Sequence, residues 1–205
     1  MEPYIKFNKE KILKFTSKER YLFMKKWINN RKNVTAIDLG CGQGTSTIAL
    51  SHFFTTIYGI DPSEQMLKYA RNLKKKLSKE TGYNNINSVH FYKGHFLNIP
   101  IKKVDMIFMF NSLHYSLYNK LFKFNEILDN IFNHINKNGL LYIREPYDTT
   151  SLAIQITDKA LIKEKNQVLK KTRELLDKYI ELNKNKIEVM EKLDKFYLKI
   201  LKKIK

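Results

Sequence analysis

The residues best suited to ligand chemistry lie in one glycine-rich segment, Asp38-Leu39-Gly40-Cys41-Gly42-Gln43-Gly44. The segment ends a short apolar run, Val34 to Leu39, which is typical of a buried strand. Its glycines let the backbone turn sharply and approach a ligand, and the helix expected behind them offers unpaired amides. The glycine spacing is GxGxG, whereas dinucleotide sites use GxGxxG, and the Asp38 carboxylate would repel a pyrophosphate. We therefore expect a ligand that presents an amine or hydroxyl groups to this loop.

A second acid stands at the end of the next expected strand. Asp61 lies 17 residues after Gly44 and directly follows the run Thr56 to Ile60. A carboxylate in this place can accept hydrogen bonds from both hydroxyls of a ribose. Together, the glycine loop and Asp61 predict a site for a nucleoside that carries a cationic or amino-acid tail.

These two segments, IDLGCGQGTSTIAL and GIDPSEQMLKYAR, resemble the first two motifs of the class I S-adenosylmethionine-dependent methyltransferases. The resemblance covers about residues 33–146 and is closest in character to the small-molecule branch that includes trans-aconitate methyltransferase-like proteins. It implies S-adenosyl-L-methionine as the cofactor. It also implies in-line methyl transfer to an oxygen or nitrogen acceptor, for which we expect a small molecule.

The resemblance further implies the cofactor contacts. Asp38, Gly40 and Gly42 would line the methionine moiety. Asp61 would hold the ribose, and Met66 would flank the adenine. The full set of implied contacts is Asp38, Gly40, Cys41, Gly42, Gly44, Asp61, Pro62, Met66, His95, Phe96, Asn111 and Leu113.

One implied contact departs from the family pattern. After the third strand the family usually has Gly-Asp-Ala or a similar sequence, whose acid accepts a hydrogen bond from the adenine amino group. This chain has Gly94-His95-Phe96 instead. A neutral His95 nitrogen could accept that bond, or the Phe96 amide could serve instead. His95 could equally be a solvated loop residue.

Candidate catalytic groups follow the fourth and fifth expected strands. The fourth ends in Phe110-Asn111-Ser112-Leu113-His114-Tyr115, which resembles the family's exit beside the reacting methyl group. His114 could be a general base, a substrate contact or a packing residue. Glu145 could orient or deprotonate a substrate and Arg144 could bind a carboxylate, or each could be an ordinary loop charge. The exit has no Asp/Asn-Pro-Pro-Tyr sequence, which argues against methylation of adenine amino groups in DNA.

Apolar periodicity alternates between strands and helices along most of the chain. Strands that are almost wholly apolar indicate a parallel sheet covered on both faces. The expected fold is α/β: a doubly wound, mostly parallel, Rossmann-like sheet of about five strands in the order 3-2-1-4-5, with helices on both faces. Strands are expected at 34–39, 56–60, 89–92, 104–110 and 140–143, and helices at 8–30, 45–54, 63–79 and 116–135.

The chain is expected to divide into three segments. These are an N-terminal helical cap (1–32), an S-adenosylmethionine-binding domain (33–146) and a basic helical C-terminal segment (147–205). Typical family members add an antiparallel pair of strands after the fifth strand, which a helical tail would lack. One alternative is therefore a non-catalytic S-adenosylmethionine-binding or interaction protein without a full acceptor site.

The helical prediction for the tail depends on a heptad-like spacing. Apolar residues near the end of the chain step by 3, 4, 3 and 4 positions. Such a helix could pack on the domain or serve as a basic arm for a partner or an oligomer. The residues of this stripe are Met190, Leu193, Tyr197, Ile200 and Ile204.

Composition adds a charge question. The chain has 38 basic and 20 acidic side chains and a formal net charge of +18. Such a field attracts nucleic acid, so an RNA methyltransferase is a further alternative. Only five of the basic residues are arginines, the preferred fork for phosphates, and AT-rich codons alone produce a surplus of lysine.

Cysteine use indicates the compartment. The single cysteine, Cys41, is expected to fill space in the glycine loop. One cysteine allows no internal disulfide and no cysteine cluster for a metal, which favours the cytoplasm. No apolar run suits a signal peptide or a membrane span.

Overall fold

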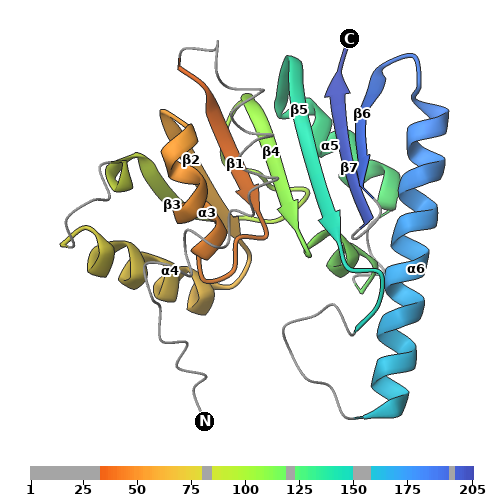
Figure 1. Ribbon diagram of the computed structural model, residues 1–205, viewed down its shortest axis with the longest axis horizontal. Helices are drawn as coiled ribbons and strands as arrows, with labels where there is room; N and C mark the ends of the chain where they lie inside the picture. The colour runs from red at the N-terminus through yellow and green to blue at the C-terminus, as the bar shows by residue number, and fades with distance from the viewer. Residues whose placement is uncertain (1–32, 80–84, 119–122, 150–157, 194–196) are drawn as a thin grey trace. The chain divides into compact units, whose positions relative to one another are not determined.

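The computed structural model describes residues 33–79, 85–118, 123–149, 158–193 and 197–205 (Figure 1). The chain divides into two compact units, which we call unit 1 (Met1–Lys93) and unit 2 (Gly94–Lys205). The helix predicted over 8–30, and with it the N-terminal cap, lies outside the described residues. The boundary expected between residues 146 and 147 stays a prediction.

Unit 1 contains a parallel sheet of three strands in the order β3-β2-β1. Positions 36 to 39 of β1 are all buried, so both faces of this strand are covered, which explains its continuous apolar run. The strand order and the three strand positions confirm the prediction to within one residue. The bounds are β1 Thr35–Leu39, β2 Thr56–Asp61 and β3 Val89–Lys93.

Two helices belong to this sheet, α3 (Thr45–Leu50) and α4 (Glu64–Leu77). The 3-10 turns η1 (Ser51–Phe53) and η2 (Ile86–Ser88) complete the described part of unit 1.

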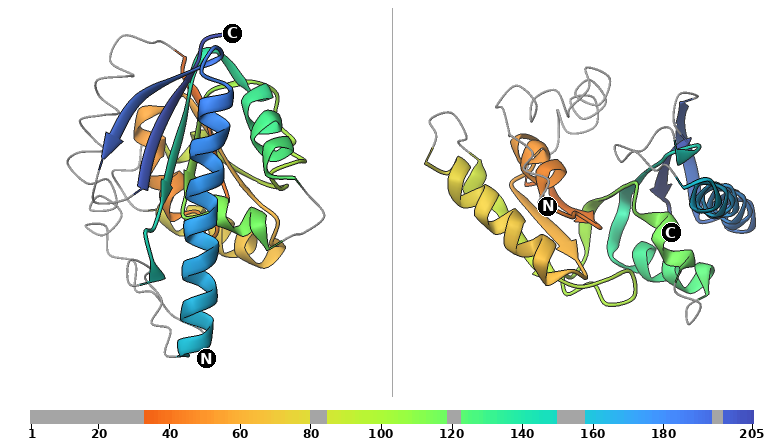
Figure 2. Two further views of the ribbon diagram at one scale, coloured as in Figure 1. Left: turned by 90° about the vertical axis from the view of Figure 1, so that its right-hand side faces the viewer. Right: turned by 90° about the horizontal axis from the view of Figure 1, so that it is seen from below.

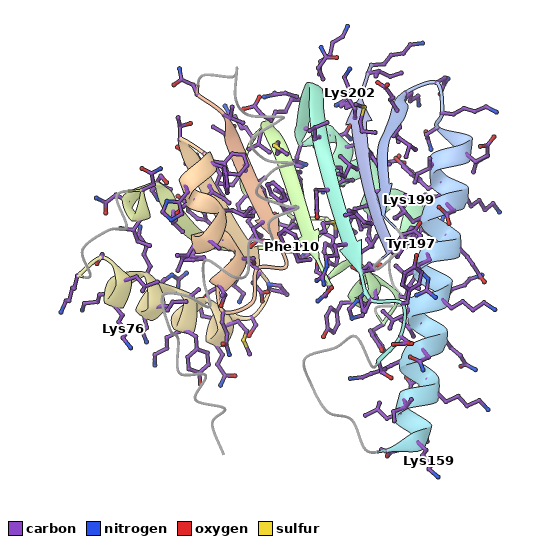
Figure 3. All side chains as sticks on the ribbon, in the orientation of Figure 1. Lys76, Phe110, Lys159, Tyr197, Lys199 and Lys202 are labelled. Atoms are coloured by element: carbon purple, nitrogen blue, oxygen red, sulfur yellow. The ribbon has the colours of Figure 1, made fainter. Side chains whose placement is uncertain are left out.

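The start of α4 follows from its capping residue. The Ser63 hydroxyl accepts a hydrogen bond from the Met66 amide (3.3 Å), and the acidic Glu64 lies in the first turn. Lys76, in the last turn, points away from the helix into solvent (Figure 3). The buried face of the helix is formed by Leu67, Ala70, Leu73 and Leu77.

Unit 2 contains a mixed sheet of four strands in the order β4-β5-β7-β6. β4 pairs parallel with β5, as predicted, whereas β7 is antiparallel to both β5 and β6. The bounds are β4 Val104–Phe110, β5 Ile135–Glu145, β6 Ile187–Leu193 and β7 Tyr197–Lys203.

The helices of unit 2 are α5 (Phe124–Asn133) and α6 (Lys159–Leu182), and the 3-10 turn η3 spans Leu113–Leu117. α6 runs along the strands of this unit, and its first turns extend beyond them (Figure 2). Its buried side chains accordingly begin only at Leu169.

The helical tail expected up to the end of the chain is wrong. The helix ends at Leu182, and β6 and β7 follow as an antiparallel pair. Tyr197 to Leu201 are buried without interruption, because β7 lies between two other strands. The side chains of this stretch are apolar or aromatic except for Lys199, which pairs with Asp177 of α6 (2.8 Å). A strand buried on both faces contains apolar residues at many spacings, and the heptad-like steps were among them. The sheet strands that the tail was expected to lack are present.

The helix expected over 116–135 is also wrong at both ends. η3 occupies its first residues, and α5 begins only at Phe124. Ile135 already belongs to β5, where it pairs with Val104, and the ladder resumes with Met106 opposite Leu140. The Lys-Asn-Gly turn is thus an irregularity inside β5, with Asn138 at a φ of 63°.

Candidate functional site

In unit 1, the glycine loop is fixed to the end of β2. The amides of Gly40 and Cys41 both donate to the Ile60 carbonyl (2.8 and 3.1 Å), and the Gly44 amide donates to the Cys41 carbonyl. Gly40, Gly42 and Gly44 have φ values of 82°, 53° and 77°. This left-handed backbone is what the glycine-rich sequence makes accessible.

Two of these glycines differ in their surroundings. A Cβ on Gly44 would lie 2.6 Å from the Phe91 ring and 2.8 Å from the Ala70 Cβ, so the start of α3 packs closely against its neighbours. A Cβ on Gly42 would meet nothing within 4 Å. The space beside Gly42 is therefore open within the described part of unit 1.

Asp38 is buried beneath this loop with half of its hydrogen-bonding capacity unused. Its Oδ2 accepts hydrogen bonds from the hydroxyls of Ser46 (2.6 Å) and Thr47 (2.7 Å). Its Oδ1 is buried and has no hydrogen-bond partner among the described residues. Burial raises the pKa of Asp38 to about 6; the two hydroxyl bonds oppose this shift, and the negative charge of Asp61 adds to it.

Asp61 is held at the loop by two backbone amides. Its Oδ2 accepts from the Gly42 amide and its Oδ1 from the Ser63 amide, both at 2.9 Å. Each carboxylate oxygen has a second acceptor position, so these bonds orient the side chain without exhausting it. The structure thus brings together the two acids and the glycines that the sequence singled out in unit 1.

The remaining predicted contacts of unit 1 differ in exposure. Pro62 is exposed and Met66 is half-buried. Cys41 is buried, and its Sγ would lie 3.0 Å from a Cβ on Gly59, which agrees with its expected space-filling role. Burial also raises the pKa of the Cys41 thiol, so the thiol stays protonated and unreactive.

In unit 2, His95 organises its own loop. Its Nδ1 accepts a hydrogen bond from the Leu97 amide (3.2 Å), while its backbone pairs with that of Asn98. A neutral ring that accepts at Nδ1 carries its proton on Nε2. The Phe96 carbonyl accepts a hydrogen bond from the Asn130 side chain (2.8 Å).

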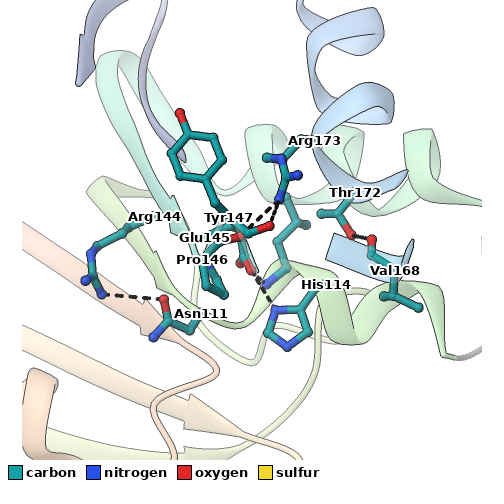
Figure 4. Close-up of polar contacts among 10 residues, drawn as sticks. Asn111, His114, Arg144, Glu145, Pro146, Tyr147, Val168, Thr172 and Arg173 are labelled. Atoms are coloured by element: carbon teal, nitrogen blue, oxygen red, sulfur yellow. Dashed lines mark hydrogen bonds and ion pairs between the residues drawn. The ribbon is translucent and has the colours of Figure 1, made fainter. Parts of the chain in front are cut away.

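The exit of β4 has a bent backbone. Asn111 has a φ of 54°, its amide donates to the Arg144 carbonyl (2.7 Å), and its Oδ1 accepts from the Arg144 guanidinium at 3.5 Å (Figure 4). Leu113 is fully buried. The end of β5 therefore fixes the turn that leads into η3.

The two predicted catalytic residues are in direct contact. His114 Nδ1 lies 2.6 Å from Glu145 Oε2, and the ring points toward the end of β5 (Figure 4). Glu145 is completely buried, and its Oε1 accepts from the Leu113 amide (2.7 Å). Histidine and carboxylate thus form a buried pair, a relation that the sequence separation of 31 residues does not disclose.

Sequence reasoning missed three residues that support these sites. Ser46 and Thr47 bond to Asp38, and their position just after the third loop glycine was the available signal. Arg173 of α6 donates to the Pro146 and Tyr147 carbonyls (3.2 and 2.7 Å), immediately after Glu145 (Figure 4). No local pattern links Arg173 to β5.

Comparison with known proteins identifies the class. A family model described as a methyltransferase domain matches residues 30–198. The chain therefore belongs to the methyltransferase domain family, in the group of S-adenosylmethionine-dependent methyltransferases, and S-adenosylmethionine is its cofactor.

Individual relatives are distant. The chain is 30% identical over 95 residues to the probable S-adenosylmethionine-dependent methyltransferase CRG1 of Saccharomyces cerevisiae, a match that covers 42% of this chain and only 29% of that protein. Among solved structures, it is similar to an S-adenosylmethionine-dependent methyltransferase from Aquifex aeolicus (TM-score 0.64, 20% identity, 97% of this chain and 100% of that one). It is also similar to the plantazolicin methyltransferase BpumL in complex with SAH (TM-score 0.64, 16% identity, 95% and 82%). These likenesses establish the mixed α/β Rossmann-like methyltransferase fold.

Within the part of the chain that the structure describes, no helix has the length and apolar character needed to cross a membrane.

Proposed function

We propose that this protein transfers the methyl group of S-adenosylmethionine to an oxygen or nitrogen atom of a small molecule. The single observation that carries the proposal concerns Asp38 and the loop above it. Among the described residues, the buried Oδ1 of Asp38 has no hydrogen-bond partner, and a Cβ on Gly42 would meet nothing within 4 Å. A buried carboxylate oxygen without a donor is costly, and a ligand ammonium group, or a water held by it, would remove that cost.

For the residues of unit 1 the proposal keeps the cofactor roles that the family resemblance implies. Asp38, Gly40 and Gly42 would hold the methionine part, since the acid favours a cation and the glycines let it approach. Asp61 is already oriented by two amides and would accept the ribose hydroxyls with its remaining positions. Met66 is half-buried and would flank the adenine.

The predicted contacts of unit 2 remain part of the proposal. Asn111 and Leu113 would contact the cofactor near the methyl group. Either His95 or the Phe96 amide would contact the adenine.

When bound, the cofactor supplies an electrophilic methyl group on a sulfonium. The protein's main contribution is to hold the acceptor at attack distance, which contributes up to roughly 7–11 kcal/mol in favourable models. The two acids and the fixed loop backbone serve this positioning.

The structure bears differently on the two alternative functions, a non-catalytic binding protein and an RNA methyltransferase. The non-catalytic alternative was motivated by a missing strand pair, and β6 and β7 supply that pair. The RNA methyltransferase alternative is supported only by the net charge, to which exposed lysines such as Lys76 and Lys159 contribute (Figure 3). Relation to the trans-aconitate-like branch, a cytoplasmic location and oligomer formation stay predictions.

Isothermal titration with S-adenosylmethionine and its demethylated product tests the proposal. Wild type should bind both ligands, and Asp61→Ala should lose binding. Glu64→Ala removes an exposed carboxylate three residues further on and is the matched control that should bind like wild type. If wild type binds neither ligand, the proposal is wrong.

A further inference from the structure

We infer that the methyl acceptor is a hydroxyl or an amine on an aromatic or apolar body, and that His114 Nε2 removes its proton while Glu145 orients the ring. The inference rests on the proposed function and names the substrate class of that same site. It excludes a carboxylate acceptor.

The pair with Glu145 uses only one nitrogen of the His114 ring. The 2.6 Å contact joins Nδ1, not Nε2, to Glu145 Oε2. Among the described residues Nε2 has no hydrogen-bond partner, and the His114 side chain is 8% exposed. One ring nitrogen is therefore bound to an acid inside unit 2 while the other remains available.

Glu145 determines which nitrogen of the His114 ring carries the proton. Glu145 accepts from the Leu113 amide on Oε1, so its backbone partner stabilises the ionised carboxylate. An ionised carboxylate oxygen can only accept a hydrogen bond, so Glu145 Oε2 requires a donor on the His114 ring. The ring proton therefore lies on Nδ1, and the lone pair is on Nε2. This is the arrangement of a general base with an orienting acid.

A general base is needed for some methyl acceptors and not for others. A carboxylate acceptor is already ionised near neutral pH and needs no base. A completely buried Glu145 charge would also repel it. A hydroxyl or amine must lose a proton as it forms its new bond to carbon, and the pair supplies a place for that proton.

The body of the acceptor is indicated by the aromatic residues next to the base. The Tyr115 ring lies 4.3 Å from the His114 ring, and the Tyr118 ring lies 6.1 Å from Tyr115, between centroids. Tyr115 and Tyr118 are 60% and 43% exposed. Exposed aromatic rings in series offer faces on which an aromatic or apolar molecule can pack.

Methyl transfer to this acceptor breaks one of its bonds to hydrogen and forms one bond to carbon. The acceptor O–H or N–H bond breaks, and its proton moves to His114 Nε2. The acceptor lone pair forms the new bond to the methyl carbon, and the electron pair of the carbon–sulfur bond stays on sulfur. His114 later gives the proton to solvent.

Nitrogen-15 NMR of protein with labelled histidines tests the base without any acceptor. The expected neutral form of His114 has its proton on Nδ1, with the signal identified by its loss in His114→Asn. Glu145→Gln should abolish this tautomer preference. An Nε2-protonated neutral ring in wild type would overturn the inference.

Product chemistry tests the acceptor class. The protein is incubated with methyl-labelled S-adenosylmethionine and a macromolecule-free cell extract, and labelled products are treated with mild alkali. Ethers and methylated amines survive, as we expect, whereas esters release labelled methanol and would contradict the inference. No labelled product, despite binding in the titration above, would contradict methyl transfer itself.

Kinetics on a labelled product separates catalysis from folding. His114→Asn should lower the rate about 100-fold or more and remove the rise of rate with pH, while the cofactor Kd stays unchanged. A purely structural role for His114 would leave the shape of the pH profile unaltered.

Discussion

Each unit of this protein contains a carboxylate that is almost completely buried, Asp38 in unit 1 and Glu145 in unit 2, and these two carboxylates are satisfied in different ways. In unit 1, Asp38 receives both of its hydrogen bonds on one oxygen, and the other oxygen has no partner among the described residues. In unit 2, Glu145 receives one bond on each oxygen, from the Leu113 amide and the His114 ring. Asp38 can therefore accept a hydrogen bond from a ligand, whereas Glu145 acts through the His114 ring that it already contacts.

The largest expected effect concerns the charge of Asp38. Its pKa of about 6 in the folded protein exceeds the ordinary value of 3.8. Well below pH 4 the group is protonated in both states. As pH rises through these two pKa values the unfolded chain releases its proton first, so folding stability falls, by roughly 3 kcal/mol in total, and stays lower above pH 6.

Asp38→Asn should remove this contribution. The free energies of unfolding of wild type and variant are measured in urea between pH 4 and 7.5. As pH rises over this range, the variant should become more stable than wild type by about the amount that wild type loses. If the difference in free energy of unfolding stays constant over this range, the Asp38 charge does not destabilise the folded protein.

The next effect is on cofactor affinity. Asp38→Asn should weaken S-adenosylmethionine binding by about 10- to 100-fold, since a hydrogen bond to a charged group contributes about 1.5–3 kcal/mol. Glu145→Gln should change it less than about twofold. Titration calorimetry at pH 7.5 measures both, and equal losses in the two variants would remove the contrast between the units.

A smaller effect is expected on the stability of Glu145→Gln, at about 1.5 kcal/mol, because two hydrogen bonds to a buried carboxylate lose their charge. Glu126→Gln, an exposed residue of α5, is the matched control and should unfold like wild type. Urea midpoints report both variants. An unchanged midpoint for Glu145→Gln would show that the pair is not maintained in solution.

The smallest effect is that of Gly42→Ala, which should cost about 1 kcal/mol because only its left-handed φ of 53° is strained. Gly44→Ala should cost more, since its Cβ would lie 2.6 Å from Phe91. Comparing their unfolding midpoints tests whether the space beside Gly42 is open. A greater loss for Gly42→Ala would contradict it.

The sequence predicted unit 1 better than unit 2 for a physical reason. β1, the glycine loop and the Ser63 cap are local features, fixed by residues that follow one another. The strand character of β7 depends on pairing with β5 and β6, which no local pattern reveals. The apolar steps through Tyr197 and Ile200 were therefore interpreted as a helix.

The sites follow the same division. Asp38, Asp61 and the loop glycines were predicted as a group because they lie in two consecutive motifs. His114 and Glu145 were predicted singly, and their contact depends on the parallel pairing of β4 with β5. That Asp38 Oδ1 has no partner among the described residues could not be predicted, because it depends on which carboxylate oxygen accepts from Ser46 and Thr47.

A crystal structure with S-adenosylhomocysteine would show whether Asp38 and Asp61 bind the cofactor. We expect the ligand's amino group, or a water bound to it, at about 2.7–3.2 Å from Asp38 Oδ1, and the ribose hydroxyls on Asp61. A ligand bound elsewhere, with that oxygen still lacking a donor, would contradict this expectation.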